Sequence, residues 1–158
     1  MISHPISPVF DEKSEILILG SFPSVKSREV GFYYGHPQNR FWRVLAAVFE
    51  AEIPHSTDEK REFLLGHHIA LWDVIASCEI VGSSDSSIRS VVPNDLSLIL
   101  SAAPIKKIFV NGRTAETCYK RFSEKLTGRA AVCLQSTSPA NARITLDALT
   151  LEWRKIKE

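Results

Sequence analysis

Residues 32–42 read Phe32-Tyr33-Tyr34-Gly35-His36-Pro37-Gln38-Asn39-Arg40-Phe41-Trp42, a run of aromatic and hydrogen-bonding side chains around a Gly and a Pro. Pro37 cannot continue a helix from upstream, but a helix can begin just after it. Beyond it, apolar residues recur with the 3.6-residue period of a helix, at Phe41, Trp42, Leu45, Val48 and Phe49. We therefore predict a polar and aromatic loop that leads into an amphipathic helix over residues 39–50.

The residues of this loop have two possible roles. Asn39 can act only as the N-cap of the helix, or it can belong to a site, because backbone N–H groups at a helix N-terminus favour anions. The spacing of Phe41 and Trp42 favours the core. The residues before Pro37 show no such period, so that structural and site roles both stay open for them.

Composition predicts one globular domain over residues 1–158. The chain has 44% hydrophobic and 23% charged residues, which is ordinary for a folded domain of this size. The formal net charge is +1, so there is no polybasic tail or broad cationic field. A nucleic-acid partner would have to be met by a local basic patch.

The sequence shows no metal, cofactor, secretion or membrane signal. Its three cysteines are far apart, without a C-x-x-C pair, and the adjacent His67 and His68 point in different directions on a helix or a strand. The first residues lack a basic region followed by an apolar run, and no apolar stretch approaches the roughly 20 residues of a membrane span. We expect a monomer without metal or cofactor, in the cytoplasm, or in the nucleus of a eukaryote.

Short apolar runs alternate with helical patterns along the chain, which predicts a parallel sheet with helices on both faces. The expected strands cover residues 15–21, 69–75, 105–112 and 130–135, and the expected helices cover 39–50, 57–67, 93–100, 113–126 and 144–156. Polar loops follow three of the strands, over residues 20–28 with an extension through 39, 73–89 and 136–143. Since parallel strands end at the same edge of a sheet, these loops should converge.

The loops supply hydroxyls, aromatic rings, a carboxamide and arginines, but no hydrolase triad, redox fingerprint or phosphate-binding glycine loop. Such a pocket can stack a flat ring, hold phosphates and stabilise charge with neutral donors. That chemistry fits an enzyme that flips a base out of DNA, but from the residues alone a nucleotide or metabolite binder is the favoured interpretation.

Three motifs resemble the uracil-DNA glycosylase superfamily. They are Gly20-Ser21-Phe22-Pro23-Ser24, the run from Gly35 to Trp42, and Ser136-Thr137-Ser138-Pro139-Ala140. The H-P-x-N-R-F-W run is especially similar to the mismatch-specific uracil and thymine glycosylases. The first motif, with Leu71-Trp72-Asp73-Val74 and Ser84-Asp85-Ser86-Ser87-Ile88, is most similar to the hypoxanthine (deoxyinosine) branch.

This resemblance implies an α/β fold, a three-layer α/β/α sandwich around a short, mostly parallel four-stranded sheet. It also implies a monofunctional glycosylase of base-excision repair, which hydrolyses the N-glycosidic bond of a flipped base in DNA and leaves an abasic site. The partner would be DNA that contains a deaminated or mispaired base. The resemblance to the hypoxanthine branch makes hypoxanthine the expected base. Mismatch-specific relatives carry a water-activating Asn where this chain has Phe22, so the chemistry must come from elsewhere.

In the hypoxanthine branch the Asn of the H-P-x-N run is catalytic, which corresponds to Asn39. We expect Asn39 either to orient the attacking water or to hydrogen-bond the leaving base, and His36 beside it to stabilise charge on the base. The resemblance places Phe22, Tyr34 and Asp73 against the flipped base, with Tyr34 as the stacking ring and Asp73 as the reader of its edge. The expected DNA contacts are Ser21, Ser24, Ser136, Ser138, Ala140, Asn141 and Arg143. The alternatives are a uracil or mismatch glycosylase and a DNA- or nucleotide-binding member of the fold that does not cleave.

Overall fold

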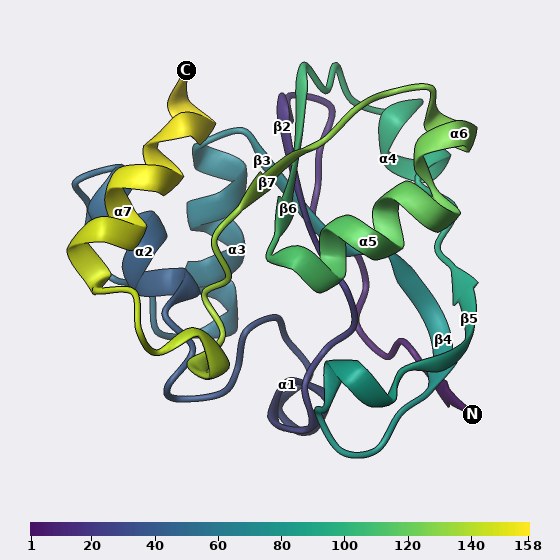
Figure 1. Ribbon diagram of the computed structural model, residues 1–158. Coiled ribbons are helices and arrows are strands. Elements are labelled where there is room, and N and C mark those ends of the chain that lie inside the picture. The colour runs from purple at the N-terminus through teal and green to yellow at the C-terminus, as the bar shows by residue number, and fades with distance from the viewer.

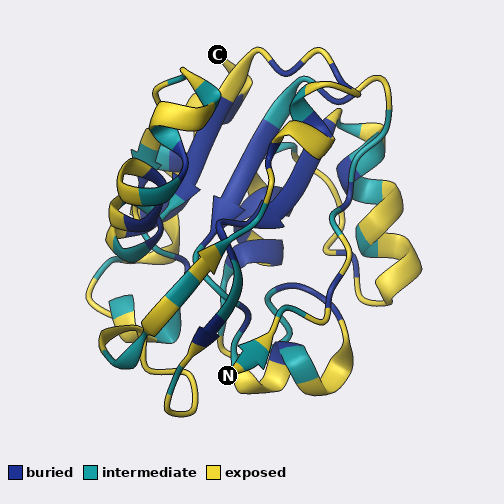
Figure 2. Cartoon of the chain, turned by 90° about the vertical axis from the view of Figure 1, so that its right-hand side faces the viewer, coloured by how far each residue is buried: buried dark blue, intermediate teal, exposed yellow.

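The computed structural model describes residues 1–158 and confirms the predicted α/β sandwich. Its central sheet holds four parallel strands in the order β3 (Ile69–Asp73), β2 (Ile16–Gly20), β6 (Lys107–Asn111) and β7 (Val132–Leu134). Figure 2 shows this sheet as the buried centre of the molecule, with more exposed elements around it. All five residues of β3 are buried, which explains its nearly continuous apolar sequence.

Helices cover both faces of the sheet (Figure 1). One layer contains α2 (Phe41–Val48), α3 (Thr57–Gly66) and α7 (Leu146–Trp153), and the other contains α4 (Ser97–Leu100), α5 (Arg113–Phe122) and α6 (Glu124–Thr127). A short 3₁₀-helix, η3 (Arg154–Lys157), follows α7. None of the helices combines the length and the apolar character that crossing a bilayer requires.

The aromatic residues of the opening run anchor α2, as their spacing predicts. Phe41 and Trp42 are 0% and 5% exposed, and the Trp42 indole N–H donates to the Tyr33 carbonyl at 3.1 Å. The Phe41 ring also meets the Trp153 ring edge-on, with 5.7 Å between centroids. The helix thereby holds the loop before it against the core.

A second sheet was not predicted. It has three strands in the order β1 (Ile2–Ser3), β4 (Ile75–Glu79) and β5 (Arg89–Pro93), and both pairings are antiparallel. The predicted loop over 73–89 is therefore wrong between Ile75 and Glu79, where β4 follows β3 after the single residue Val74. Its mixed composition hid this strand, because its two buried residues, Ile75 and Cys78, do not alternate with exposed ones as a half-buried strand would.

Two helix predictions and one loop prediction need correction. The predicted helix from Pro93 is wrong at its start, since Pro93 ends β5 and α4 begins at Ser97. The predicted helix 113–126 is interrupted at Ser123 between α5 and α6. The predicted loop over 20–28 is wrong from Val25 onward, because Ser24 caps a short helix, α1 (Val25–Val30), by accepting the N–H of Ser27 on its hydroxyl.

Candidate active site

A small cavity of about 110 Å³ lies at the carboxyl edge of the central sheet. It is lined by Gly20, Ser21, Phe22, Pro23, Ser24, Ser27, Tyr33, Tyr34, Asn39, Asp73, Ser83, Asp85, Asn111, Ser136, Thr137 and Ser138. Apart from Asn111, at the end of β6, these residues come from the three loops that were predicted to converge. The sheet register explains the meeting, because Gly20 at the end of β2 lies directly beside Asp73 at the end of β3.

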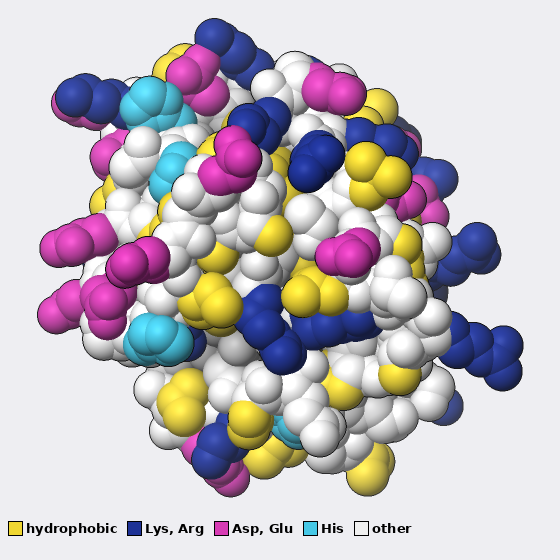
Figure 3. All heavy atoms as spheres, turned by 90° about the vertical axis from the view of Figure 1, so that its left-hand side faces the viewer, with side chains coloured by type: hydrophobic (Ala, Val, Ile, Leu, Met, Phe, Trp, Pro, Cys, Tyr) yellow, Lys and Arg dark blue, Asp and Glu magenta, His cyan; other side chains and the backbone are white.

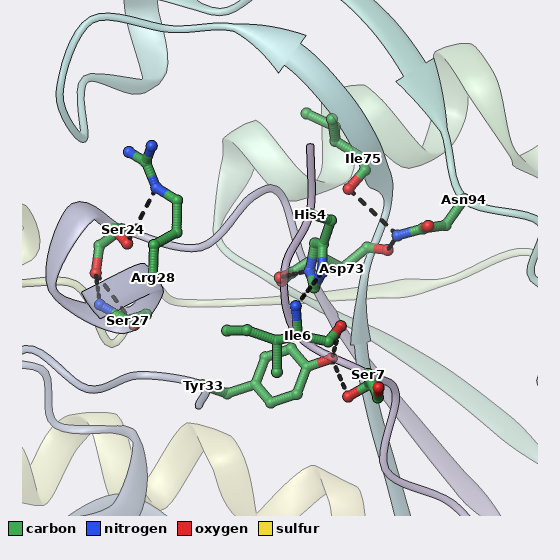
Figure 4. Close-up of polar contacts among 10 residues, drawn as sticks. All are labelled: His4, Ile6, Ser7, Ser24, Ser27, Arg28, Tyr33, Asp73, Ile75 and Asn94. Carbon is green, nitrogen blue, oxygen red and sulfur yellow. Dashed lines mark hydrogen bonds and ion pairs between the residues drawn. The ribbon is translucent and has the colours of Figure 1, made fainter. Parts of the chain in front are cut away.

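Hydroxyl groups tie the first loop to the H-P-x-N loop, and Figure 4 shows the Ser24 and Ser27 side chains of this link. The Ser24 hydroxyl lies 3.1 Å from that of Ser27, and the Ser27 hydroxyl accepts the N–H of Gly35 at 2.9 Å. Ser27 is 2% exposed, so this link is internal. Helix α1 therefore connects the two loops that form one wall of the cavity.

Asn39 combines a structural contact with a free donor. Its Oδ1 accepts the N–H of Phe41 at 2.9 Å at the start of α2, as an N-cap would. Its NH₂ group makes no hydrogen bond within the protein, and the residue lines the cavity. Because Oδ1 is held by the helix, the carboxamide is oriented and its donor is available to a ligand.

Tyr34 has an unusual environment. Its backbone φ is +52°, in the left-handed region, and its ring stacks on Phe41 with centroids 4.0 Å apart. Its hydroxyl is buried and has no hydrogen-bond partner. Burial first, and then the negative charge of Asp73, raises the pKa of Tyr34 above its usual value, so the hydroxyl keeps its proton.

Asp73 is paired with a residue from the opposite end of the sequence. Its Oδ2 lies 2.7 Å from Nε2 of His4, and the two side chains are only 5% and 4% exposed. The N–H of Ile6 donates to Nδ1 of His4 at 3.2 Å, so Nδ1 carries no proton and Nε2 is the donor to Asp73 (Figure 4). Asn94 donates to the backbone carbonyl of Asp73 at 2.9 Å, which also fixes the strand end.

The last loop is held by two side chains from other elements. The carboxamide of Asn111, at the end of β6, donates to Oγ1 of Thr137 at 3.0 Å and accepts the Thr137 N–H at 3.1 Å. The guanidinium of Arg40 donates to the carbonyls of Asn141 and Ile144 at 3.0 Å and 2.7 Å. Arg40 thus acts as a clamp on protein carbonyls in this structure.

A wider groove of about 570 Å³ adjoins the cavity and shares Asp85, Asn111, Ser136 and Ser138 with it. The groove is lined by Asp85, Asn111, Gly112, Arg113, Thr114, Glu116, Cys133, Leu134, Gln135, Ser136, Ser138, Ala140, Asn141 and Glu152. A cavity that opens into a groove suits a small ring attached to a chain.

Most of the expected site residues lie at these two hollows. Ser21, Phe22, Ser24, Tyr34, Asn39, Asp73, Ser136 and Ser138 line the cavity, and Ala140 and Asn141 line the groove. His36 and Arg143 line neither of them. The Nδ1 atom of His36 accepts the N–H of Gln38 at 3.1 Å, and Arg143 is exposed.

Sequence reasoning missed four residues of this region, namely His4, Asp85, Asn111 and Thr137, as individual site residues. Asn111 stood at the end of a predicted strand and Thr137 inside a quoted motif, and both positions were usable signals. Asp85 lay inside a quoted motif without a role. His4 gave no signal, because its partner Asp73 lies 69 residues away in the chain.

The family model of the uracil DNA glycosylase superfamily matches residues 7–156. The chain therefore belongs to the uracil DNA glycosylase superfamily, in agreement with its fold and with the motifs that form the cavity.

Within this superfamily the chain is similar to two proteins named hypoxanthine DNA glycosylase. It is 36% identical to the one from Methanosarcina barkeri over 86% of each chain, and 35% identical to the one from Methanosarcina acetivorans over 99% of this chain and 98% of the relative. The solution NMR structure of a candidate uracil DNA glycosylase from Methanosarcina acetivorans matches with a TM-score of 0.81, at 32% identity over the whole of both chains. The fold and these relatives support a DNA glycosylase.

Proposed function

We propose that the protein is a monofunctional DNA glycosylase that removes hypoxanthine, the deaminated form of adenine, and leaves an abasic site. The observation that carries this proposal is the oriented Asn39 carboxamide at a cavity that Asp73 also lines. The names of the two Methanosarcina relatives support the choice of base. Flipping such a base costs a few kcal/mol, and least when it is mispaired.

Asn39 acts on the departing base in this mechanism. Loss of the base leaves an oxocarbenium-like sugar and places negative charge on the base. The NH₂ group of Asn39 donates to that charge, while Oδ1 stays on the Phe41 N–H and keeps the amide in place. The backbone N–H groups of Ser21 and Phe22, which donate to no protein acceptor, add to this stabilisation. Phe22 supplies no water-activating side chain, so positioning and leaving-group stabilisation carry the rate.

The first prediction concerns Asn39→Ser, tested in single-turnover excision from duplexes that contain hypoxanthine. Serine retains an oxygen that can cap α2, but it lacks the carboxamide donor. We expect the excision rate to fall by roughly 100- to 1,000-fold, the usual effect of removing one donor to developing charge. The melting temperature should stay close to that of the wild type.

Asn39→Ala is the companion variant, which removes both the donor and the cap and should also lose about 1 kcal/mol of stability. A serine variant that excises at the wild-type rate would rule out the proposed role of Asn39. Duplexes with uracil, thymine or xanthine complete the substrate panel. Release of uracil but not hypoxanthine would identify a uracil glycosylase, and DNA binding without any abasic site would identify a non-cleaving member of the fold.

A further inference from the structure

Four residues line both the cavity and the groove, and they mark the passage between the two hollows. They are Asp85, Asn111, Ser136 and Ser138. A base that sits in the small cavity stays attached to a sugar and a strand, which need the space of the wider groove. The glycosidic bond of that base therefore crosses the passage, and these four residues surround the bond that is to be broken.

Asp85 is the only one of the four with a charged side chain. The other three side chains serve their own loops. Both ends of the Asn111 carboxamide are bonded to Thr137. The Ser136 hydroxyl accepts the Ser138 N–H at 3.1 Å, and the Ser138 hydroxyl accepts a backbone N–H of the same loop at 3.2 Å. The negative charge at the passage is thus that of Asp85.

Asp85 opens the 3₁₀-helix η1 (Asp85–Ser87), in the connection between β4 and β5. The residue lies exposed at the rim of the hollows, and its carboxylate forms no ion pair. Burial of the carboxylate raises the pKa of Asp85, while the nearby hydroxyls of Thr114 and Ser21 lower this pKa by less. The passage therefore contains an unneutralised carboxylate that holds a proton more readily than usual.

This position is unfavourable for DNA binding alone. A carboxylate in the groove repels the phosphates of any strand that lies there. The reaction itself, however, creates a positive charge at the same place, because loss of the base leaves an oxocarbenium-like sugar at C1′. A negative charge fixed at the passage is repelled by the bound strand but attracted to this transition state.

We propose that Asp85 is a catalytic residue that acts on the sugar, whereas Asn39 acts on the base. As the bond between C1′ and the base breaks, its electron pair stays on the base, and the Asp85 carboxylate stabilises the positive sugar. A water molecule then bonds to C1′ through its oxygen and gives one proton to Asp85. The carboxylate passes this proton to the departed base, so that the products are neutral hypoxanthine and an abasic sugar. This inference rests on the proposed function and names the group that acts where Phe22 cannot.

The test is single-turnover release of hypoxanthine by Asp85→Asn, with enzyme in excess over the duplex. Asparagine has the same shape and keeps an oxygen for the hydroxyls of Thr114 and Ser21, but it carries no charge and takes up no proton. We expect a roughly 100- to 1,000-fold slower reaction, within the usual contribution of an acid–base or charge-stabilising group. The melting temperature should stay close to that of the wild type.

Asp58→Asn is the matched control for this charge change. Asp58 is an exposed carboxylate in the first turn of α3, and it lines neither the cavity nor the groove. The variant has the same net charge as Asp85→Asn, and its rate should equal that of the wild type. An equal loss of rate in both variants would overturn the role of Asp85.

A binding measurement separates catalysis from simple contact with DNA. The probe is a hypoxanthine duplex whose sugar carries a 2′-fluorine, which resists cleavage. Since Asp85→Asn removes a charge that repels phosphates, this variant should bind the probe at least as tightly as the wild type. A loss of affinity large enough to account for the slower reaction would overturn the proposal.

Chemical rescue provides a readout that a structural role would not move. Asp85→Ala leaves space at the passage, and added formate supplies a carboxylate that can enter from the open groove. Formate should restore part of the rate lost in Asp85→Ala, while chloride at the same ionic strength should not. Asn39→Ser lacks a donor rather than a carboxylate, so formate should leave its rate unchanged.

An Asp85→Ala variant that formate does not accelerate would contradict the assignment. The outcomes also separate this inference from the function on which it rests. If the wild type releases no base from any duplex, the glycosylase proposal fails. If the wild type releases hypoxanthine and Asp85→Asn does so at the same rate, only the role of Asp85 fails.

Discussion

At the scale of single residues, Gly20 is the cavity residue that leaves no room for a side chain. It ends β2 and faces the Asp73 carboxylate and the Tyr34 hydroxyl from so short a distance that a side chain cannot be added without moving them. The side chain is therefore excluded by neighbours rather than by backbone conformation, since Gly20 is not among the glycines with positive φ.

We expect Gly20→Ala to abolish most of the excision activity, because the new methyl group must push aside both groups that line the cavity. The strain should also lower stability by about 1–3 kcal/mol, as over-packing commonly does. Gly66→Ala is a suitable control, since nothing lies within 4 Å of its Cβ position at the end of α3. Full activity in Gly20→Ala would show that Asp73 and Tyr34 can move aside without loss of function, and it would contradict this prediction.

The site could be predicted from sequence only where its residues are local to a motif. Asn39 and Tyr34 belong to the run that also builds α2, so their importance was visible in one stretch of eleven residues. Their detailed roles were not visible, because the surroundings of the Tyr34 hydroxyl are set by Asp73 and Asn111, which lie far from it in the sequence. His4 could not be found at all, since no pattern near residue 4 reports a contact with residue 73.

At the scale of elements, the Arg40 side chain connects the start of α2 to the loop before α7. Its two hydrogen bonds end on carbonyls of a segment more than 100 residues away in the sequence. The backbone agrees, because the Arg40 N–H donates to the Thr137 carbonyl at 3.1 Å. The loop that lines the groove is therefore held by the same short segment that carries Asn39.

We expect Arg40→Lys to loosen this loop, because a single ammonium group cannot match the fork of donors that reaches both carbonyls. The loss of stability should be about 1.5–3 kcal/mol, the range for hydrogen bonds from charged groups. Faster amide exchange in residues 139–144 would locate the effect. Arg43→Lys, on the exposed side of the same helix, is the control, and an equal loss there would argue against the clamp.

Helix α3 provides a test that depends on pH. Ser56 and Glu59 form a capping box, with the Glu59 N–H on the Ser56 hydroxyl at 3.0 Å and the Ser56 N–H on the Glu59 carboxylate at 3.1 Å. Hydrogen bonds from Ser56 hold the pKa of Glu59 below its usual value of 4.5. The ionised carboxylate therefore stabilises the fold above pH 4.5, and this contribution disappears as the pH falls through the lowered pKa.

We expect Glu59→Gln to melt at a lower temperature than the wild type at pH 7, with a difference that shrinks steadily in acid. Melting curves between pH 7 and pH 3 measure this. Glu62→Gln changes an exposed carboxylate of the same helix that makes no ion pair or hydrogen bond, and it should shift the curve little. A Glu59 difference that persisted unchanged at pH 3 would contradict the assignment.

Elements with one strong pattern were predictable, and elements defined by their neighbours were not. The buried strands and the helices α2 and α3 follow from apolar spacing and caps, because each signal lies within the element. Strand β4 depends instead on β1 and β5, which pair with it from distant parts of the chain. Its exact place at the end of β3 is a tertiary property that no local pattern records.

At the scale of the whole molecule, the charge is balanced rather than concentrated. The formal net charge is +1, and Figure 3 shows basic side chains mixed with acidic and uncharged ones on the face that it presents. The groove itself contains Arg113 together with three acidic residues, Asp85, Glu116 and Glu152. Affinity for undamaged DNA should therefore come from few phosphate contacts.

We expect weak non-specific binding with a shallow salt dependence. About three phosphate contacts give a slope on the order of −3 in a plot of log affinity against log salt. Fluorescence anisotropy on an undamaged duplex, at salt concentrations from about 50 to about 200 mM, measures this slope. Arg113→Gln should make it shallower by about one, and a slope near −10 would reveal a cationic surface that these charges do not predict.

The two ends of the chain are not equivalent for handling the protein. The first residues pair with β4 and bring His4 to Asp73, whereas the last residues lie on the opposite side of the molecule (Figure 1). A purification tag joined at Met1 is therefore attached three residues before a side chain that touches the cavity wall. Preparations tagged at the C-terminus are the ones whose substrate preference will describe the protein itself.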